Sequence, residues 1–182
     1  MGIDAEKERN SPVEPHIELV VLIDLQNNIW HWTGKSYPTS DQENGLVRIA
    51  DLRTHFLDLP SIGKVMILVC HDLKVFDPRH YNRESLSAFR RDIINCFRCL
   101  ARYQEPVVVL HHPHTTDCVR GIRKTDNRYR YIPGTWDSAW SKLTKWVPTI
   151  TTYASAGRYY NSGNERSELN DVREGTKCGS TI

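Results

Sequence analysis

Three short aliphatic runs, each followed by polar residues, constrain this sequence more than any other feature. The runs cover residues 17–23, 65–70 and 107–110, and they are rich in β-branched side chains and free of turn residues. Such runs are typical of strands buried in a parallel sheet. Between the second and third runs, apolar residues recur at helical intervals. The sequence therefore predicts an α/β fold, a three-layer sandwich with a mainly parallel, Rossmann-like sheet.

Further elements follow from the same patterns. The apolar stripe after the second run predicts a helix over about 82–103. The capping-box spacing of Ser40 and Glu43, with apolar residues at helical spacing behind it, predicts another helix over 40–57. A tryptophan-rich helix is expected over 134–143 and a weak strand over 147–152. The segment 120–131 is basic and polar, which predicts irregular structure.

The chain is predicted to form a single α/β domain over residues 17–154. Residues 1–16 are charged, contain two prolines and have almost nothing apolar, so we expect a flexible N-terminal arm. Residues 155–182 form a polar C-terminal tail.

Composition narrows the classes of partner. The 182 residues include 24 Lys and Arg against 22 Asp and Glu, so the charge gives no reason to expect nucleic acid. No apolar run approaches the roughly 20 residues of a membrane helix, and no signal peptide is apparent at the N-terminus. We therefore expect a cytoplasmic protein that acts on a small molecule, without a membrane partner and without a cofactor. A homo-oligomer is compatible with the sequence.

Polar side chains follow each of the three aliphatic runs. Because the carboxyl ends of parallel strands meet at one edge of a sheet, we expect these side chains to line one pocket. Asp24 has a second interpretation, since an Asp after a strand often caps the next turn. The side chains are Asp24 after the first run, His71, Asp72 and Lys74 after the second, and His111, His112, His114, Asp117 and Cys118 after the third.

Nucleophilic catalysis by a thiol is the chemistry that this set supports best. Cys118 would attack an electrophilic carbon, Asp24 would take the thiol proton, and Lys74 would lower the thiol pKa. An unactivated thiol has a pKa near 8.5 and is only a few per cent ionised at neutral pH, so a base and a cation raise the reactive fraction. The alternative is that Cys118 is a small buried side chain without chemistry.

A metal site is a second hypothesis. Cys96 and Cys99 have the C-x-x-C spacing, and three histidines and Cys118 follow within reach of a tetrahedral zinc set. Both cysteines fall inside a predicted helix, however, whereas a zinc knuckle uses a tight turn. We therefore predict no metal. The histidines are His111, His112 and His114.

The motif VVLIDLQNN resembles the opening strand of the isochorismatase-like hydrolases, which include nicotinamidases and related cysteine amidohydrolases. Ser87, Ala88 and Phe89 look like the S-A-F of that family, and TTDCV is similar to its T-x-x-C-V segment. The resemblance implies Asp24 as the base and Lys74 as the stabilising cation. It also implies Cys118 as the nucleophile, with backbone amides near it forming an oxyanion hole.

Two other α/β families resemble parts of the chain. The segment from VMILVCHDL to VVVLHHP is similar to the second half of a RecA-type helicase core, in which Asp72 would bind a magnesium-coordinated water. The same segment looks like an SGNH-type esterase, although its Gly-Asp-Ser block is absent. Either resemblance implies a catalytically silent binding module that keeps the scaffold alone.

Overall fold

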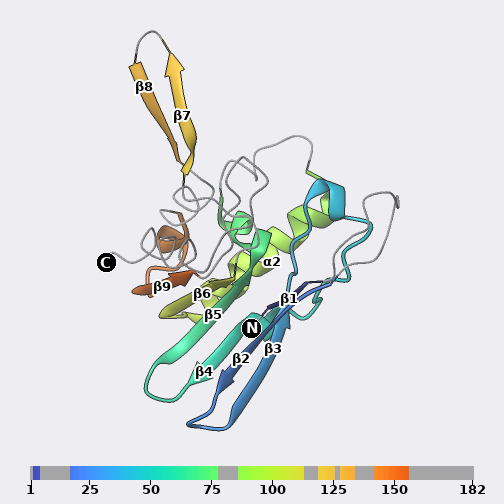
Figure 1. Ribbon diagram of the computed structural model, residues 1–182. Helices are drawn as coiled ribbons and strands as arrows, with labels where there is room; N and C mark the ends of the chain where they lie inside the picture. The colour runs from blue at the N-terminus through green and yellow to red at the C-terminus, as the bar shows by residue number, and fades with distance from the viewer. Residues whose placement is uncertain are drawn as a thin grey trace.

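The computed structural model describes residues 2–4, 17–77, 86–112, 119–125, 128–133 and 142–155 (Figure 1). Within these ranges the chain combines a long helix with a mixed sheet that contains parallel strands. The α/β class predicted from the sequence is confirmed at this level.

The central sheet has four strands in the order β4-β5-β6-β9. Strand β5 (Gly63–Val69) pairs in parallel with β6 (Val108–His112), and β6 pairs in parallel with β9 (Thr152–Ser155). Strand β4 (Phe56–Leu59) joins the other side of β5 in antiparallel orientation. The prediction that the second and third aliphatic runs are parallel neighbours is confirmed.

Helix α2 (Ala88–Gln104) connects β5 to β6, as the apolar stripe predicts. Ser87 caps its N-terminus by accepting a hydrogen bond from the Arg90 backbone N–H at 3.2 Å. The helix ends at Gln104, and the next residue, Glu105, takes the left-handed conformation common at helix ends. Its apolar stripe is buried against the sheet and includes Ile93, Ile94, Phe97 and Ala101.

Strand β5 is buried on both faces because two apolar clusters cover it. Alternate side chains of a strand point to opposite faces. Met66 and Leu68 therefore belong to the cluster that contains α2. The other face carries the second cluster, in which Val65, Ile67 and Val69 meet Val20, Leu22 and Ile29.

The first aliphatic run lies outside the central sheet, contrary to the prediction. Strand β2 (Glu18–Asp24) pairs antiparallel with β3 (Ile29–Gly34) and with β1 (Gly2–Asp4). The chain reverses within the intervening residues 25–28, and Asn28 takes the left-handed conformation that Asn tolerates in turns. Strand β1 belongs to the predicted arm 1–16, whose remaining residues lie outside the described part of the chain.

The predicted helix over 40–57 is wrong. This segment holds two single 3-10 turns, η1 (Ser40–Gln42) and η2 (Leu52–His55), and then enters β4. The Asp51 carboxylate accepts a hydrogen bond from the Arg53 backbone N–H at 3.0 Å and starts η2 locally. Pairing of β4 with β5 then takes the last two residues of this segment, Phe56 and Leu57, into the sheet.

Three more expectations concern the C-terminal half. The segment predicted to be irregular instead forms a hairpin of β7 (Val119–Thr125) and β8 (Arg128–Pro133), so that prediction is wrong. The strand predicted over 147–152 begins only at Thr152. Residues 142–146 are helical, while 134–141 of the predicted tryptophan-rich helix and residues 156–182 lie outside the described ranges.

Candidate functional site

The carboxyl ends of β5 and β6 meet at one edge of the central sheet. Leu68 pairs with His111 and Val69 with His112, so the two strands end side by side. The 3-10 segment η3 (Cys70–Phe76) follows β5 directly. The second and third runs therefore end at one edge, as predicted, while His114, Asp117 and Cys118 lie outside the described residues. In open α/β sheets ligands collect at such an edge.

Cys70 occupies the turn between β5 and η3. Its φ of 44° lies in the left-handed region, which non-glycine residues adopt rarely and at a cost of about 1–3 kcal/mol. The residue is 3% exposed, and its Sγ lies 3.2 Å from Nδ1 of His71. A thiol and an imidazole thus lie within hydrogen-bonding distance at the end of a central strand.

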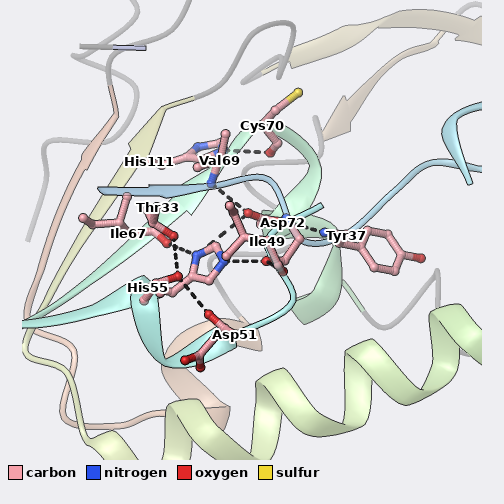
Figure 2. Close-up of polar contacts among 12 residues, drawn as sticks. Thr33, Tyr37, Ile49, Asp51, His55, Ile67, Val69, Cys70, Asp72 and His111 are labelled. Atoms are coloured by element: carbon pink, nitrogen blue, oxygen red, sulfur yellow. Dashed lines mark hydrogen bonds and ion pairs between the residues drawn. The ribbon is translucent and has the colours of Figure 1, made fainter. Parts of the chain in front are cut away.

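The neighbouring strands hold the backbone of this turn. Nε2 of His111 on β6 lies 3.0 Å from the Cys70 carbonyl oxygen (Figure 2). Its Nδ1 lies 2.6 Å from the Tyr153 hydroxyl on β9. Burial lowers the pKa of His111 to about 4, so the ring is neutral at pH 7. We therefore assign Nε2 as the donor to the carbonyl and Nδ1 as the acceptor from Tyr153.

These contacts bear on the metal hypothesis. Both ring nitrogens of His111 are engaged in hydrogen bonds, so neither is available to a metal ion. Cys96 and Cys99 lie within α2, as the sequence predicts, and both are exposed. Across the described ranges no three His, Cys, Asp or Glu side chains are grouped as a metal would require.

Lys74 lies half-buried in η3, one turn beyond Cys70. Burial lowers the pKa of its ammonium group, while the charge of Cys70 raises it, and Lys35 and Arg90 lower it. Lys74 follows Cys70 by four residues in η3, the segment at the carboxyl end of β5.

Asp24 lies elsewhere, in the turn between β2 and β3. Its carboxylate accepts hydrogen bonds from the backbone N–H groups of Gln26 at 3.0 Å and Asn27 at 3.1 Å, and from the Asn27 amide at 2.7 Å. The Asn27 bonds lower the pKa of Asp24. Figure 1 shows this turn at the bottom of the view, well away from the segment that follows the end of β5. The interpretation of Asp24 as a turn cap is confirmed, and the structure does not bring Asp24 and Lys74 together.

Cys118, the third predicted catalytic residue, lies outside the described part of the chain, together with His114 and Asp117. His112 is the last described residue before this segment, at the end of β6. The role of Cys118 remains a prediction from the sequence.

Asp72 is completely buried and serves the backbone. One carboxylate oxygen accepts hydrogen bonds from the backbone N–H groups of Ser36 at 3.0 Å and Tyr37 at 2.8 Å, and the other accepts from Val69 at 3.1 Å. Burial raises the pKa of Asp72 to about 7, against the opposing effect of these hydrogen bonds. The side chain fastens the 36–37 segment to the start of η3 and so supports the turn that carries Cys70.

His55 completes this buried network beneath the edge (Figure 2). Its Nδ1 lies 2.7 Å from the Ile67 carbonyl oxygen and 4.0 Å from the Asp72 carboxylate, and Nε2 lies 2.8 Å from Ser36 Oγ. Burial lowers the pKa of His55 to about 4. The neutral ring therefore donates from Nδ1 to the Ile67 carbonyl, while the Ser36 hydroxyl donates to the Ile49 carbonyl oxygen at 2.7 Å and places its oxygen against Nε2. Since Ser36, His55 and Asp72 are all fully buried, this set supports the fold and meets no solute.

Two of these residues had no separate role in the sequence-based predictions. Cys70 is the last residue of the second aliphatic run, so the pattern predicts that it belongs to a buried strand. Its position directly before His71 at the end of that strand could have indicated the contact between the two side chains. His55 fell inside the wrongly predicted helix 40–57. Its pairing with Ser36 depends on contacts between segments, which spacing alone does not reveal.

No model of a known protein family, no curated protein and no solved structure matches this chain. Among the residues that the structure describes, no helix has the length and apolar character needed to cross a membrane.

Proposed function

We propose that this protein is a small-molecule hydrolase in which a thiol attacks the carbonyl carbon of an amide or ester. The site would lie at the carboxyl ends of β5 and β6, with Lys74 as the cation that favours the thiolate. The single observation that carries this proposal is the parallel pairing of β5 with β6. Because of this pairing, η3, which contains Lys74, and the end of β6, from which the chain continues toward Cys118, lie at one edge of the sheet.

The resemblance to isochorismatase-like hydrolases supports the same chemistry. It assigns Cys118 as nucleophile and Asp24 as base, and it implies the three-layer, Rossmann-like arrangement as the finer description of the fold. A cytoplasmic location and a small-molecule substrate belong to this proposal. The distance of the β2–β3 turn from η3 leaves the base at this edge to be supplied by another group, such as His71.

A catalytically silent binding module is the second candidate. It is favoured by the position of Asp24, whose carboxylate is engaged in capping an exposed turn. The RecA-type version of this candidate needs Asp72 to hold a magnesium-bound water. Both oxygens of that carboxylate already accept backbone hydrogen bonds, which argues against this version.

The hydrolase proposal is tested with an activated ester, p-nitrophenyl acetate, and the variant Lys74→Met. Removing the cation raises the thiol pKa, and a shift of one unit lowers the thiolate fraction, and with it kcat/KM at neutral pH, about tenfold. The matched control is Lys64→Met, a lysine on β5 whose ammonium pairs with Asp58 at 3.2 Å. Hydrolysis by wild-type protein no faster than by an equal concentration of free cysteine contradicts the proposal and favours the binding module.

A further inference from the structure

We propose that Cys96 and Cys99 on helix α2 bind one soft monovalent metal ion, Cu(I), through a pair of thiolates. The inference does not depend on the proposed hydrolase function, because neither residue belongs to the edge at the carboxyl ends of β5 and β6. It departs from the sequence-based expectation of no metal, which was drawn from the requirements of zinc.

The two cysteines are neighbours on the surface of α2. Both are exposed, and neither forms a disulfide. They are three residues apart near the middle of a helix of 17 residues, and residues at this spacing lie on the same face of a helix. A dissolved ion can therefore reach both sulfurs from the same side.

The helix between the two cysteines is fixed to the rest of the molecule. Phe97 is completely buried, and its ring centroid lies 4.6 Å from that of His55. The buried Arg98 donates a hydrogen bond from Nε to the Val75 carbonyl oxygen at 2.7 Å, and its Cζ lies 4.8 Å from the centre of the Trp146 ring. Local unwinding of α2 would break these contacts, so the two cysteines keep their helical spacing.

This spacing favours a bridging ion over a direct disulfide. Cβ atoms of neighbouring side chains on one helix face are about 5–6 Å apart. A disulfide needs Cβ atoms about 3.5–4.5 Å apart, so it would require α2 to unwind. Two metal–sulfur bonds of about 2.3 Å, the length found for zinc thiolates, allow the sulfurs to lie up to about 4.6 Å apart. One ion between the two sulfurs therefore fits the intact helix.

The number of ligands selects the ion. Thiolates bind Cu(I), zinc and iron–sulfur clusters. Zinc sites use three or four protein ligands, and iron–sulfur clusters use four. The described residues contain no group of three or more His, Cys, Asp or Glu that could hold such a metal. Cu(I) has a filled d shell and is satisfied by two thiolates in a near-linear arrangement, so it is the ion that fits this pair.

Binding exchanges two protons for one ion and changes no oxidation state. Each thiol releases its proton to the solvent as its sulfur forms a bond to Cu(I), and the product is a bis-thiolate complex with a net charge of one minus. Because an ordinary thiol has a pKa near 8.5, protons compete with the ion below about that pH. The affinity for Cu(I) therefore rises with pH across the neutral range.

The first experiment uses the full wild-type chain. It is titrated with Cu(I) without oxygen, in competition with the coloured chelator bicinchoninate, and each loaded sample is then labelled with iodoacetamide and digested for mass spectrometry. We expect the protein to withdraw one equivalent of Cu(I) and to lose labelling at Cys96 and Cys99. Binding no tighter than by an equal concentration of free cysteine contradicts the proposal, and so does protection of other cysteines in place of this pair.

Single substitutions test whether the two thiols act together. We expect Cys96→Ser and Cys99→Ser each to weaken Cu(I) binding at least about a hundredfold, because joining two ligands raises the affinity by about 10²–10⁴. The matched controls Cys118→Ser and Cys178→Ser should bind Cu(I) like the wild type. Because both cysteines of the pair are exposed, we expect their variants to unfold in urea like the wild type. Wild-type affinity in both Cys96→Ser and Cys99→Ser overturns the proposal.

A variant with an unchanged number of thiols tests the helical spacing. Asn95 is exposed on α2 next to Cys96, so the double variant Asn95→Cys with Cys99→Ser keeps two surface thiols on the helix. Adjacent residues do not face each other on a helix. We expect this variant to bind Cu(I) as weakly as Cys99→Ser alone. Wild-type affinity would mean that any two thiols on α2 suffice, and would contradict the assignment of the site to the spacing of Cys96 and Cys99.

Discussion

Asp72 joins two parts of the chain through a carboxylate that is completely buried. Two effects oppose each other at this residue. Burial disfavours the charged form and raises the pKa of Asp72 to about 7, whereas three backbone N–H groups and the nearby Lys35 favour the carboxylate. Asp72 therefore makes the free energy of unfolding depend on the pH.

The substitution Asp72→Asn tests this balance. An asparagine keeps one carbonyl oxygen for Ser36 and Tyr37 but turns an amide toward the Val69 N–H, which leaves a buried donor unpaired. We expect the free energy of unfolding to fall by about 1–3 kcal/mol in urea titrations. The exposed substitution Asp58→Asn is the control, since it removes only a surface pair with Lys64.

The pH dependence has a definite sign. The folded-state pKa of Asp72 is about 7 and its ordinary value is 3.8, so its contribution to stability is fully present below about 3.8 and is lost as the pH rises through about 7. Asparagine does not titrate, and His55 is present in both proteins. The stability difference between wild type and Asp72→Asn should therefore shrink from pH 4 to pH 7. A difference that grows with pH would show that the hydrogen bonds outweigh burial.

At the scale of elements, the local sequence pattern predicted correctly those helices and strands whose structure depends mainly on their own residues. The apolar runs 65–70 and 107–110 and the stripe of α2 predicted β5, β6 and α2 correctly, because burial on two faces or along one stripe leaves a direct pattern in the sequence. The 40–57 segment has helical spacing too. Its structure is decided by pairing with β5 and by the contacts of His55 with Ile67 and Ser36, which lie outside its own sequence.

Phe97 and Phe89 on helix α2 offer a matched test of this packing. Phe97 is fully buried, and its ring centroid lies 4.6 Å from that of His55 and 5.9 Å from that of Phe76. Phe89 is 37% exposed and lies beneath the Arg48 guanidinium. We expect Phe97→Ala to reduce the free energy of unfolding by about 3–5 kcal/mol and Phe89→Ala by about 1 kcal/mol. Equal losses in urea denaturation would contradict the burial of one face of α2.

For the whole molecule, the sequence predicted which strand ends meet better than which side chains lie there. The second and third runs end side by side as predicted, and η3, which contains Lys74, follows β5 at that edge, while the catalytic role of Lys74 stays a prediction. Asp24 lies elsewhere, because the direction of the first run depends on its partner strands. The aliphatic residues of the first run suit a strand of an antiparallel hairpin as well as a strand of a parallel sheet. Only the amide side chains that follow the run indicated a turn and therefore a hairpin.

The separate sheet of β2 and β3 predicts that the molecule opens in stages. The hairpin meets β5 through a small apolar cluster, to which it contributes Val20, Leu22 and Ile29, whereas β5 and β6 also contact the larger cluster around α2. Regions with fewer buried contacts open at lower free energy. We therefore expect amide hydrogens of β2 and β3 to exchange faster than those of β5 and β6.

The substitution Val20→Ala sharpens this test. It removes about two buried carbon groups, worth about 1.6 kcal/mol, and should speed exchange in the hairpin roughly tenfold. Exchange in β6 should change little under native conditions, because β6 stays paired when the hairpin opens. Val47→Ala, at a residue that is 51% exposed, is the control. Equal acceleration in β2, β3, β5 and β6 would mean that both sheets unfold as one unit, and that damage to the hairpin reaches the edge that carries Cys70.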